Sequence, residues 1–189
     1  MRTASARTSS GVTSTVVDSP IGPLTLTAAG GRLTGLRLGE QPSAGLPSST
    51  GADEPPSAGL PSSTGAEEPP SADEAVLAEA SAQLAAYFAG ELADFDLPLS
   101  TGGTEFQQRV WRCLRDIPYG QTWSYGRLAA AAGNPKASRA VGMANNRNPI
   151  AIVIPCHRVI GADGRLVGYG GGLDRKTWLL DHERSRVAG

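Results

Sequence analysis

The chain has 189 residues, of which 40% are hydrophobic, and its net charge is −1. This length and this hydrophobic content are enough for the core of one domain or of two small ones. No apolar run approaches the roughly 20 residues that span a bilayer, and residues 1–14 lack the apolar core of a secretory signal. We therefore expect a soluble cytoplasmic protein with no membrane partner. Two cysteines and two histidines match no metal-ligand spacing and no disulfide framework, so we expect no metal and no cofactor.

Charge is divided unevenly along the chain. Residues 1–100 hold 4 Lys/Arg and 12 Asp/Glu, whereas residues 101–189 hold 13 Lys/Arg and 6 Asp/Glu, which gives net charges of −8 and +7. A strongly basic half indicates binding to a polyanion, although a solvated basic surface has the same composition. The C-terminal half is therefore the candidate for nucleic-acid binding.

The N-terminal half predicts a small antiparallel sheet covered by one helix. Residues 12–40 contain three short alternating segments with a Gly-Gly turn between the last two, which is typical of a β-meander. From Asp73 to Ala89, apolar residues fall on one helical face until Gly90 ends the pattern. An extended segment follows, and we place a domain boundary near Ser100, which gives domains of residues 1–100 and 101–189.

A tandem repeat interrupts the N-terminal half. Residues 42–55 recur as residues 56–69 with one change, from Asp53 to Glu67. The repeat is rich in Pro, Ser, Gly and acidic residues and has no aromatic ones, so it cannot bury enough apolar surface to offset the entropy of ordering. We expect a flexible loop at about residues 41–72, and a partner-binding role is the alternative.

The C-terminal half begins with three predicted helices. Thr104 is a good N-cap for the first, which ends before Pro118. Ser124 caps the second, and a Gly-Asn-Pro turn at residues 133–135 separates it from the third, at residues 136–146. Two short helices joined by such a turn are typical of a helix-turn-helix, although other helical hairpins share the pattern.

The third of these helices is unusual for its small side chains. A helix with so little bulk can approach a nucleic-acid backbone or a narrow groove closely, but packing against a neighbouring helix explains the same composition. Arg139 is the long exception on this face. Its guanidinium could pair with a phosphate or enter the base stack where a base has been extruded.

Residues 152–160 are the candidate reactive segment. Apolar residues lead into and out of Pro155, Cys156 and His157, and this pattern predicts a buried strand with a thiol and an imidazole at its end. Because neighbouring side chains of a strand point to opposite faces, we expect a distorted turn after Pro155 or a water between the two groups. A basic imidazole that is held by an acid would raise the reactivity of the thiol.

Six sequence blocks, between Thr104 and Glu183, resemble the O6-alkylguanine-DNA alkyltransferases, also called methylated-DNA–protein-cysteine methyltransferases, which repair DNA by direct reversal. They keep the order and near-constant spacing of that family. The blocks are Ser124-Tyr125, Arg139-Ala140-Val141-Gly142, Asn148-Pro149, Pro155-Cys156-His157-Arg158-Val159, Tyr169 with its glycines, and Leu179-Leu180-Asp181-His182-Glu183. With the predicted elements, the resemblance implies an α/β (α+β) fold. A small N-terminal antiparallel sheet with a helix precedes a mostly helical C-terminal domain that has a helix-turn-helix and an active-site strand.

The resemblance implies irreversible transfer of an alkyl group, such as methyl, from O6-alkylguanine to Cys156, and less readily from O4-alkylthymine. Each molecule would act once, because no second nucleophile cleaves the thioether product. An alkyl group on O6 lies inside the duplex, so the base must be flipped from the minor groove, and Arg139 would fill the vacated place. The implied partner is double-stranded DNA that carries O6-alkylguanine. It would be bound by a cytoplasmic, nucleoid-associated monomer, with cooperative assembly on DNA left open.

The resemblance also implies roles for individual residues. His157 is the water-mediated base for Cys156, Glu183 orients it, and Asn148 braces the active-site turn. Gly170 stands where some relatives carry a serine, so only its backbone amide is available to O6. The implied base pocket consists of Tyr125, Val159, Tyr169 and Gly170. The implied DNA contacts are Tyr125, Lys136, Ala137, Ser138, Arg139 and Gly142.

Three other functions fit parts of the sequence. A lesion-binding protein of the same fold would lack the cysteine, so Cys156 argues against it. A cysteine hydrolase that uses Cys156 and His157 would need an oxyanion hole and would turn over repeatedly. A transcription regulator with structural thiols would need methyl-dependent promoter binding and a second module.

Overall fold

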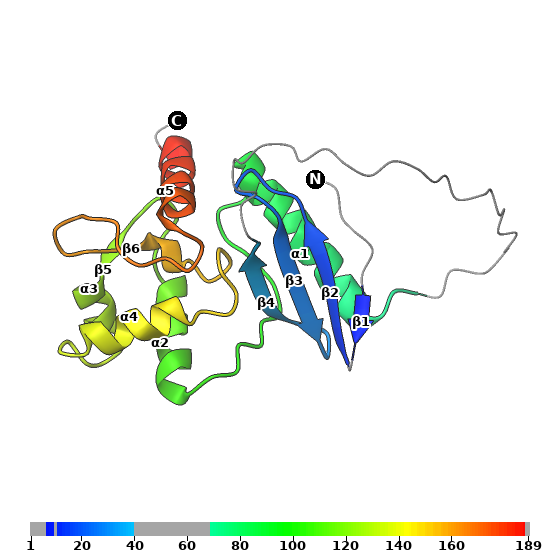
Figure 1. The fold of residues 1–189 in the computed structure, drawn as a ribbon, viewed down its shortest axis with the longest axis horizontal. Helices are drawn as coiled ribbons and strands as arrows, with labels where there is room; N and C mark the ends of the chain where they lie inside the picture. The colour runs from blue at the N-terminus through cyan, green and yellow to red at the C-terminus, as the bar shows by residue number, and fades with distance from the viewer. Residues whose placement is uncertain (1–6, 10, 40–68, 188–189) are drawn as a thin grey trace, which may run out of the picture.

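A computed structural model of the chain describes residues 7–9, 11–39 and 69–187. A sheet with one covering helix is followed by a mostly helical part (Figure 1), which confirms the predicted mixed α and β class. The repeat at residues 42–69 lies almost wholly outside the described residues, so the loop predicted there remains a prediction. Among the described residues, no helix is both long and apolar enough to cross a membrane.

The described N-terminal residues form a four-stranded antiparallel sheet in the order β1-β2-β3-β4. The predicted meander corresponds to β2 (Val12–Val17), β3 (Leu24–Ala29) and β4 (Arg32–Leu38), and β1 (Arg7–Ser9) is an additional strand that was not predicted. The Gly-Gly turn at residues 30–31 has φ values of 60° and 69°, which glycine adopts without steric cost. The predicted hairpin between β3 and β4 is therefore confirmed.

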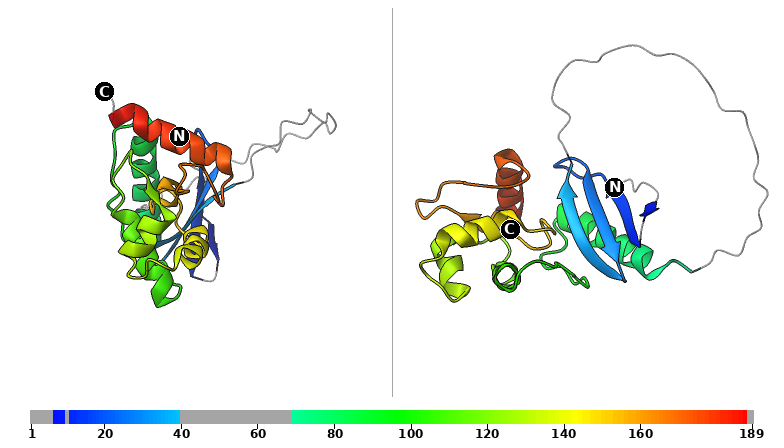
Figure 2. Two further views of the ribbon diagram at one scale, coloured as in Figure 1. Left: turned by 90° about the vertical axis from the view of Figure 1, so that its left-hand side faces the viewer. Right: turned by 60° about the horizontal axis from the view of Figure 1, so that its bottom comes forward.

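Helix α1 (Ala72–Ala89) covers one face of this sheet (Figures 1 and 2). It begins at a capping box formed by Ser71 and Glu74, and it ends at Gly90, whose φ is 78°. Alternate residues of β3 are buried, because successive side chains of a strand point to opposite faces and only one face meets the helix. The N-terminal core lies between β3 and α1.

Among the described residues, the C-terminal part contains four α-helices: α2 (Glu105–Arg115), α3 (Tyr125–Ala131), α4 (Ser138–Asn146) and α5 (Leu173–Val187). The predicted N-cap of α2, Thr104, is present as part of a capping box, with hydrogen bonds in both directions between it and Gln107. Helices α3 and α4 pack together in the predicted helix-turn-helix order.

Helix α4 begins two residues later than predicted. Lys136 and Ala137 precede it, and Ala137 takes the N-cap position without a side-chain hydrogen bond. The amide of Lys136 instead donates to Asn134 Oδ1 at 3.2 Å, in a local turn. The asparagine side chain therefore competes with the helix for this backbone group.

The predicted continuous strand at residues 152–160 is wrong in its first half. Ala151 and Ile154 form an isolated bridge, and the chain turns back between them. Ile152 has a φ of 71°, a left-handed conformation that is strained for a β-branched residue. The segment is a tight, buried turn rather than an extended strand.

The second half of this segment contains the expected distortion after Pro155. Residues Cys156–Arg158 form a single 3-10 turn, η1, and only Val159–Ile160 is extended, as β6. β6 pairs in parallel with β5 (Trp123–Ser124). Cys156 and His157 thus lie on a turn immediately before a short strand.

The edge of β4 connects the sheet to this turn. The amide of Leu36 donates to the carbonyl of Pro149 at 2.9 Å, and the amide of Ala151 donates to the carbonyl of Leu36 at 3.2 Å. β4 is also the strand of the sheet nearest the C-terminal part in Figure 1. The N-terminal sheet therefore supports the chain that leads to Cys156.

Candidate active site

A buried hydrogen-bond network surrounds the carboxylate of Glu183, on α5. His157 Nε2 lies 2.8 Å from Oε1, and Arg158 Nη2 donates to the same oxygen at 3.0 Å. Arg158 Nε donates to Oε2 at 2.9 Å, and so does the Gly120 amide at 3.0 Å. His157 and Glu183 are fully buried. The structure thus brings together the imidazole and the carboxylate, which are 26 positions apart.

Two further side chains complete this network. Tyr87 Oη, from α1, donates to Glu183 Oε1 at 2.8 Å. Arg158 Nη1 donates to the carbonyl of Ile117 at 2.7 Å, so its guanidinium joins α5 to the start of the loop after α2. Tyr87 was not predicted, because 96 positions separate it from Glu183 and no local pattern marks it.

Burial and pairing set the charges in the network. Burial acts to raise the pKa of Glu183, but the hydrogen bonds and charges of His157 and Arg158 lower it to about 2. Burial lowers the pKa of His157 against the opposing effect of Glu183. At neutral pH we therefore assign a neutral imidazole beside a carboxylate. The carboxylate can only accept, so the ring proton is on Nε2 and Nδ1 is left as an acceptor.

The thiol of Cys156 is protonated in this arrangement. It is 5% exposed, and burial raises its pKa, while a hydrogen bond from Asn148 and the charge of Lys176 act in the opposite direction. A protonated thiol is a poor nucleophile. His157 Nδ1 has no hydrogen-bond partner within the described part of the chain, and it is the nearest base along the sequence. It is therefore the candidate acceptor for the thiol proton.

Two asparagines hold the turn that carries the thiol. Asn148 Nδ2 donates to the carbonyl of Ile154 at 2.7 Å, and its Oδ1 accepts from the amide of Ile150 at 3.1 Å. The Asn145 amide lies 3.5 Å from the carbonyl of Cys156. The Asn148 contacts close the loop that contains the strained Ile152. Asn145 was not among the predicted site residues.

A cavity of about 230 Å³ lies beside Cys156. Tyr169 and Gly170, two of the predicted base-pocket residues, line it together with the cysteine, whereas Tyr125 and Val159 do not. The rest of the wall comes from β4, the end of α4 and the adjoining turns: Leu36, Arg37, Leu38, Asn145, Asn146, Asn148, Ala151 and Gly171. The cavity thus lies between the two parts of the chain.

Lys176 and Tyr125 both donate to the carbonyl of Val167, just before the glycine-rich loop. Lys176 Nζ donates to the carbonyl of Val159 at 2.6 Å and to that of Val167 at 2.9 Å. Tyr125 Oη donates to the carbonyl of Val167 at 3.3 Å. Burial lowers the pKa of Lys176 to about 8, although Cys156 acts to raise it. This buried lysine was not predicted, and it links Val159 to Val167, the residue that Tyr125 also contacts.

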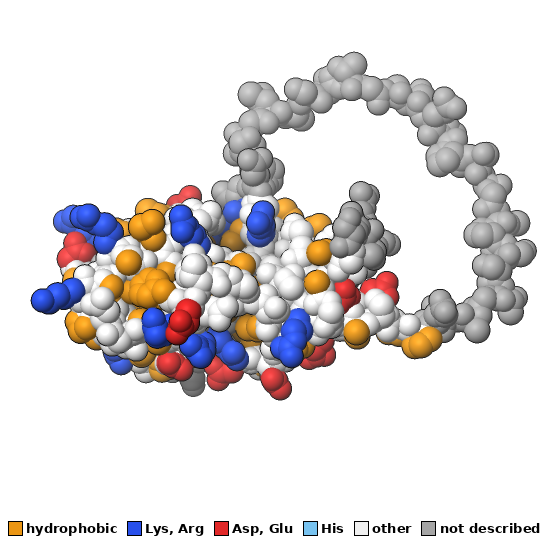
Figure 3. All heavy atoms as spheres, turned by 90° about the horizontal axis from the view of Figure 1, so that it is seen from below, with side chains coloured by type: hydrophobic (Ala, Val, Ile, Leu, Met, Phe, Trp, Pro, Cys, Tyr) orange, Lys and Arg blue, Asp and Glu red, His pale blue; other side chains and the backbone are white. Residues whose placement is uncertain are grey.

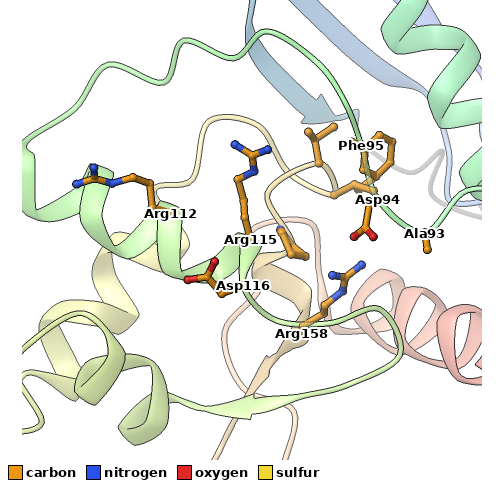
Figure 4. A pocket seen from close by; sticks show the side chains of 10 residues that line it. Ala93, Asp94, Phe95, Arg112, Arg115, Asp116 and Arg158 are labelled. Atoms are coloured by element: carbon orange, nitrogen blue, oxygen red, sulfur yellow. The ribbon is translucent and has the colours of Figure 1, made fainter.

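A larger cavity, of about 510 Å³, is bounded by the segment before Cys156 but not by Cys156 itself. Arg112 and Arg115 of α2 line it opposite Asp94 (Figure 4). Because the thiol is absent from its wall, we assign the smaller cavity to the reaction.

The predicted DNA contacts lie on and just before α4. Lys136 and Arg139 are exposed, and neither forms a salt bridge within the described ranges. A Cβ added at Gly142 would lie 3.6 Å from the Tyr125 ring, so this glycine packs α4 against the start of α3. Ala137 and Ser138 are half-buried. Figure 3 shows basic side chains with acidic ones between them on the face seen from below.

The described residues contain no group of three or more His, Cys, Asp or Glu side chains that could hold a metal ion. Cys113 is buried on α2. It does not line the cavity beside Cys156.

Two family models together match most of the chain. The ribonuclease-like domain of 6-O-methylguanine DNA methyltransferase matches residues 12–101, and the DNA binding domain of the same family matches residues 105–185. A methylated-DNA–protein-cysteine methyltransferase from Mycobacterium bovis is 52% identical over 171 residues, which cover 90% of this chain and 92% of that protein. One from Methanosarcina acetivorans is 63% identical over 113 residues, which cover 60% of this chain and 72% of that protein.

A similar fold is found in solved structures. The crystal structure of the Mycobacterium tuberculosis O6-methylguanine methyltransferase has a TM-score of 0.70 and 49% identity, over 90% of this chain and 92% of that one. The Mycobacterium tuberculosis OGT in complex with DNA has a TM-score of 0.71 and 50% identity, with the same coverage.

Proposed function

Because the chain belongs to the 6-O-methylguanine DNA methyltransferase family, we propose that it repairs alkylated DNA by taking the alkyl group onto Cys156. One observation carries this proposal. A buried thiol lies beside a cavity, and its neighbour His157 is held by an ionised Glu183 at 2.8 Å with Nδ1 left as a proton acceptor. The imidazole–carboxylate pair is the base and acid of a Cys-His-acid triad, and Cys156, the residue before His157, is its proposed nucleophile.

The chemistry follows from these groups. His157 Nδ1 accepts the thiol proton, directly or through a water, and Glu183 stabilises the resulting imidazolium. The sulfur attacks the alkyl carbon on O6, a carbon–sulfur bond forms, and the carbon–oxygen bond breaks. Its electron pair stays on O6, and the guanine takes up a proton as it leaves. The product is a thioether, which no other group of the site can cleave, so each molecule acts once.

Access to the lesion requires base flipping, because O6 lies inside the duplex. We place α4 in the minor groove, with Arg139 in the space of the extruded base and Lys136, Ala137, Ser138 and Gly142 along the backbone. Exposure of Lys136 and Arg139 supports this placement. The flipped base would lie against Tyr125, Val159, Tyr169 and Gly170. A relative of similar fold has been solved with DNA.

The proposed partner is double-stranded DNA that contains O6-alkylguanine, with O4-alkylthymine as a poorer substrate. Binding as a monomer is sufficient, because every proposed reacting group comes from one chain. Because the proposed substrate is DNA, we propose that the protein acts in the cytoplasm, at the nucleoid.

Incubation with a duplex that contains one O6-methylguanine tests this function. After digestion of the DNA to nucleosides, we expect one O6-methyldeoxyguanosine converted to deoxyguanosine per protein molecule, without release of free base. Cys156→Ala should bind the duplex and convert nothing, whereas Cys113→Ala, which removes the other buried thiol, should convert as the wild type does. Several conversions per molecule, or conversion by Cys156→Ala, would contradict the proposal.

A further inference from the structure

Tyr87 lies on α1, in the N-terminal part, but its hydroxyl contacts the carboxylate of Glu183 at the far end of the chain. Oη donates to Oε1 at 2.8 Å, and His157 Nε2 meets the same oxygen at 2.8 Å. We infer that Tyr87 is a positioning residue for the reaction: it holds the Glu183 carboxylate in place and limits the negative charge that this group presents to His157. The inference rests on the proposed function.

The distribution of donors supports this role. Arg158 contacts both carboxylate oxygens, and the Gly120 amide contacts only Oε2. Tyr87 shares Oε1 with His157, so the two compete for the electron density of one oxygen. A hydrogen bond that stabilises the carboxylate reduces its pull on the imidazole proton. Within the described residues, Tyr87 is the donor to Glu183 that comes from the N-terminal part.

The surroundings of Tyr87 fix the direction of its hydroxyl. The ring is fully buried, and its centroid lies 5.3 Å from that of Phe95 and 6.0 Å from that of Tyr119. Burial, together with the charge of Glu183, raises the pKa of Tyr87 well above its ordinary value. The phenol therefore remains a donor throughout the range in which His157 titrates.

Removal of this hydroxyl has a predictable sign. Without the bond from Tyr87, Oε1 presents more negative charge to His157, which favours the imidazolium and raises the pKa of the imidazole. The protonated imidazole cannot accept the thiol proton. In a plot of the methyl-transfer rate against pH, the acid limb, where the rate falls as His157 is protonated, should therefore move to higher pH. If Tyr87 had only a structural role, its removal would instead lower the rate by the same factor at every pH.

The test compares Tyr87→Phe with Tyr119→Phe. Tyr119 packs against Tyr87, and its buried hydroxyl has no hydrogen-bond partner in the described part of the molecule, so it is a matched control for loss of a buried phenol. Single-turnover methyl transfer from a saturating O6-methylguanine duplex is measured between about pH 5 and 9, the range around an ordinary histidine pKa. We expect the midpoint of the acid limb to rise by about half a unit or more in Tyr87→Phe, with no shift in Tyr119→Phe.

A second measurement does not depend on activity. The NMR titration of the His157 ring should show the same upward shift in Tyr87→Phe, and in that variant alone. Coincident His157 titrations for wild type and Tyr87→Phe, or an equal shift in Tyr119→Phe, would overturn the inference. Absence of methyl transfer by the wild type at every pH would instead overturn the repair function, and the ring titration would still decide the role of Tyr87.

Discussion

Glu183 is the acid of a buried network that holds His157 and Arg158. It is fully buried and it faces the guanidinium of Arg158, which is 3% exposed and has no other carboxylate within salt-bridge distance in the described residues. Two buried charges are tolerated here because each satisfies the other. The same carboxylate fixes the tautomer of His157. One residue therefore serves both the fold and the reaction.

The pKa values of Glu183 and His157 predict that acid destabilises the fold. The pKa of Glu183 falls from 4.5 to about 2 on folding, so its contribution, about 3 kcal/mol, is complete above about pH 4.5 and is lost as the pH falls toward 2. The pKa of His157 is lowered, so the unfolded chain binds its proton first and stability begins to fall below about pH 6.5. Urea unfolding between about pH 8 and 3 should therefore show a midpoint that decreases steadily below about pH 6.5. A constant midpoint would contradict these charge states.

A matched pair of variants isolates the buried carboxylate. Glu183→Gln leaves Arg158 buried without its counter-charge and should cost about 3–5 kcal/mol. Glu105→Gln, which breaks a 3.8 Å pair between groups that are 87% and 46% exposed, should change stability by less than about 0.5 kcal/mol. Equal losses in the two variants would show that the burial of the Glu183 network contributes nothing.

The sequence identified some residues of the site but not others. The neighbours Cys156 and His157 follow from one local pattern. Glu183 needed the family resemblance, because a glutamate near the end of a helix is ordinarily a surface residue. Tyr87, Asn145 and Lys176 were missed, because each reaches the site through a contact that only the folded chain creates.

Among the elements, those with local signals were predicted well. The Gly90 end of α1, the Thr104 cap of α2 and the Gly-Gly turn between β3 and β4 depend on residues within a few positions of one another. The segment before Cys156 was read as a strand, because buried strands and buried turns share a β-branched, apolar composition. Its path depends on the Asn148 side chain and on hydrogen bonds between β4 and residues 149–151. The bonds with β4 join segments that are far apart in the sequence, so no local pattern encodes them.

Helix α4 carries the arginine that we propose for base flipping. Arg139 is exposed on its first turn. If its side chain replaces the flipped base, Arg139→Ala should slow methyl transfer from duplex DNA by about tenfold or more, because unstacking a base costs a few kcal/mol. Transfer from the free O6-methylguanine base, which needs no flipping, should be nearly unchanged. The two single-turnover rates measure this difference.

The control for that variant is Arg184→Ala on α5. Arg184 is 54% exposed and lies 3.8 Å from Asp181, so its removal also takes one positive charge from the C-terminal part. It should leave the ratio of the two rates unchanged. A similar fall in both rates for Arg139→Ala would show that this arginine does not act in base flipping.

The whole molecule combines two parts that we propose as domains, residues 1–100 and 101–189. The acidic and basic net charges of these halves agree with a DNA-binding C-terminal domain beside an N-terminal domain with another task. The contacts of the N-terminal part indicate that it supports the site. The edge of β4 holds the turn before Cys156, and Tyr87 reaches Glu183. Charge and composition could predict the division but not the contacts across it.

Cys156 is the proposed final acceptor of the alkyl group. The most direct test of this role is peptide mass analysis of the protein after reaction with an equimolar O6-methylguanine duplex. We predict one added methyl group, located on Cys156, with Cys113 and all other residues unmodified. An unmodified Cys156 after the lesion has disappeared from the DNA, or a methyl group on any other residue, would contradict the account.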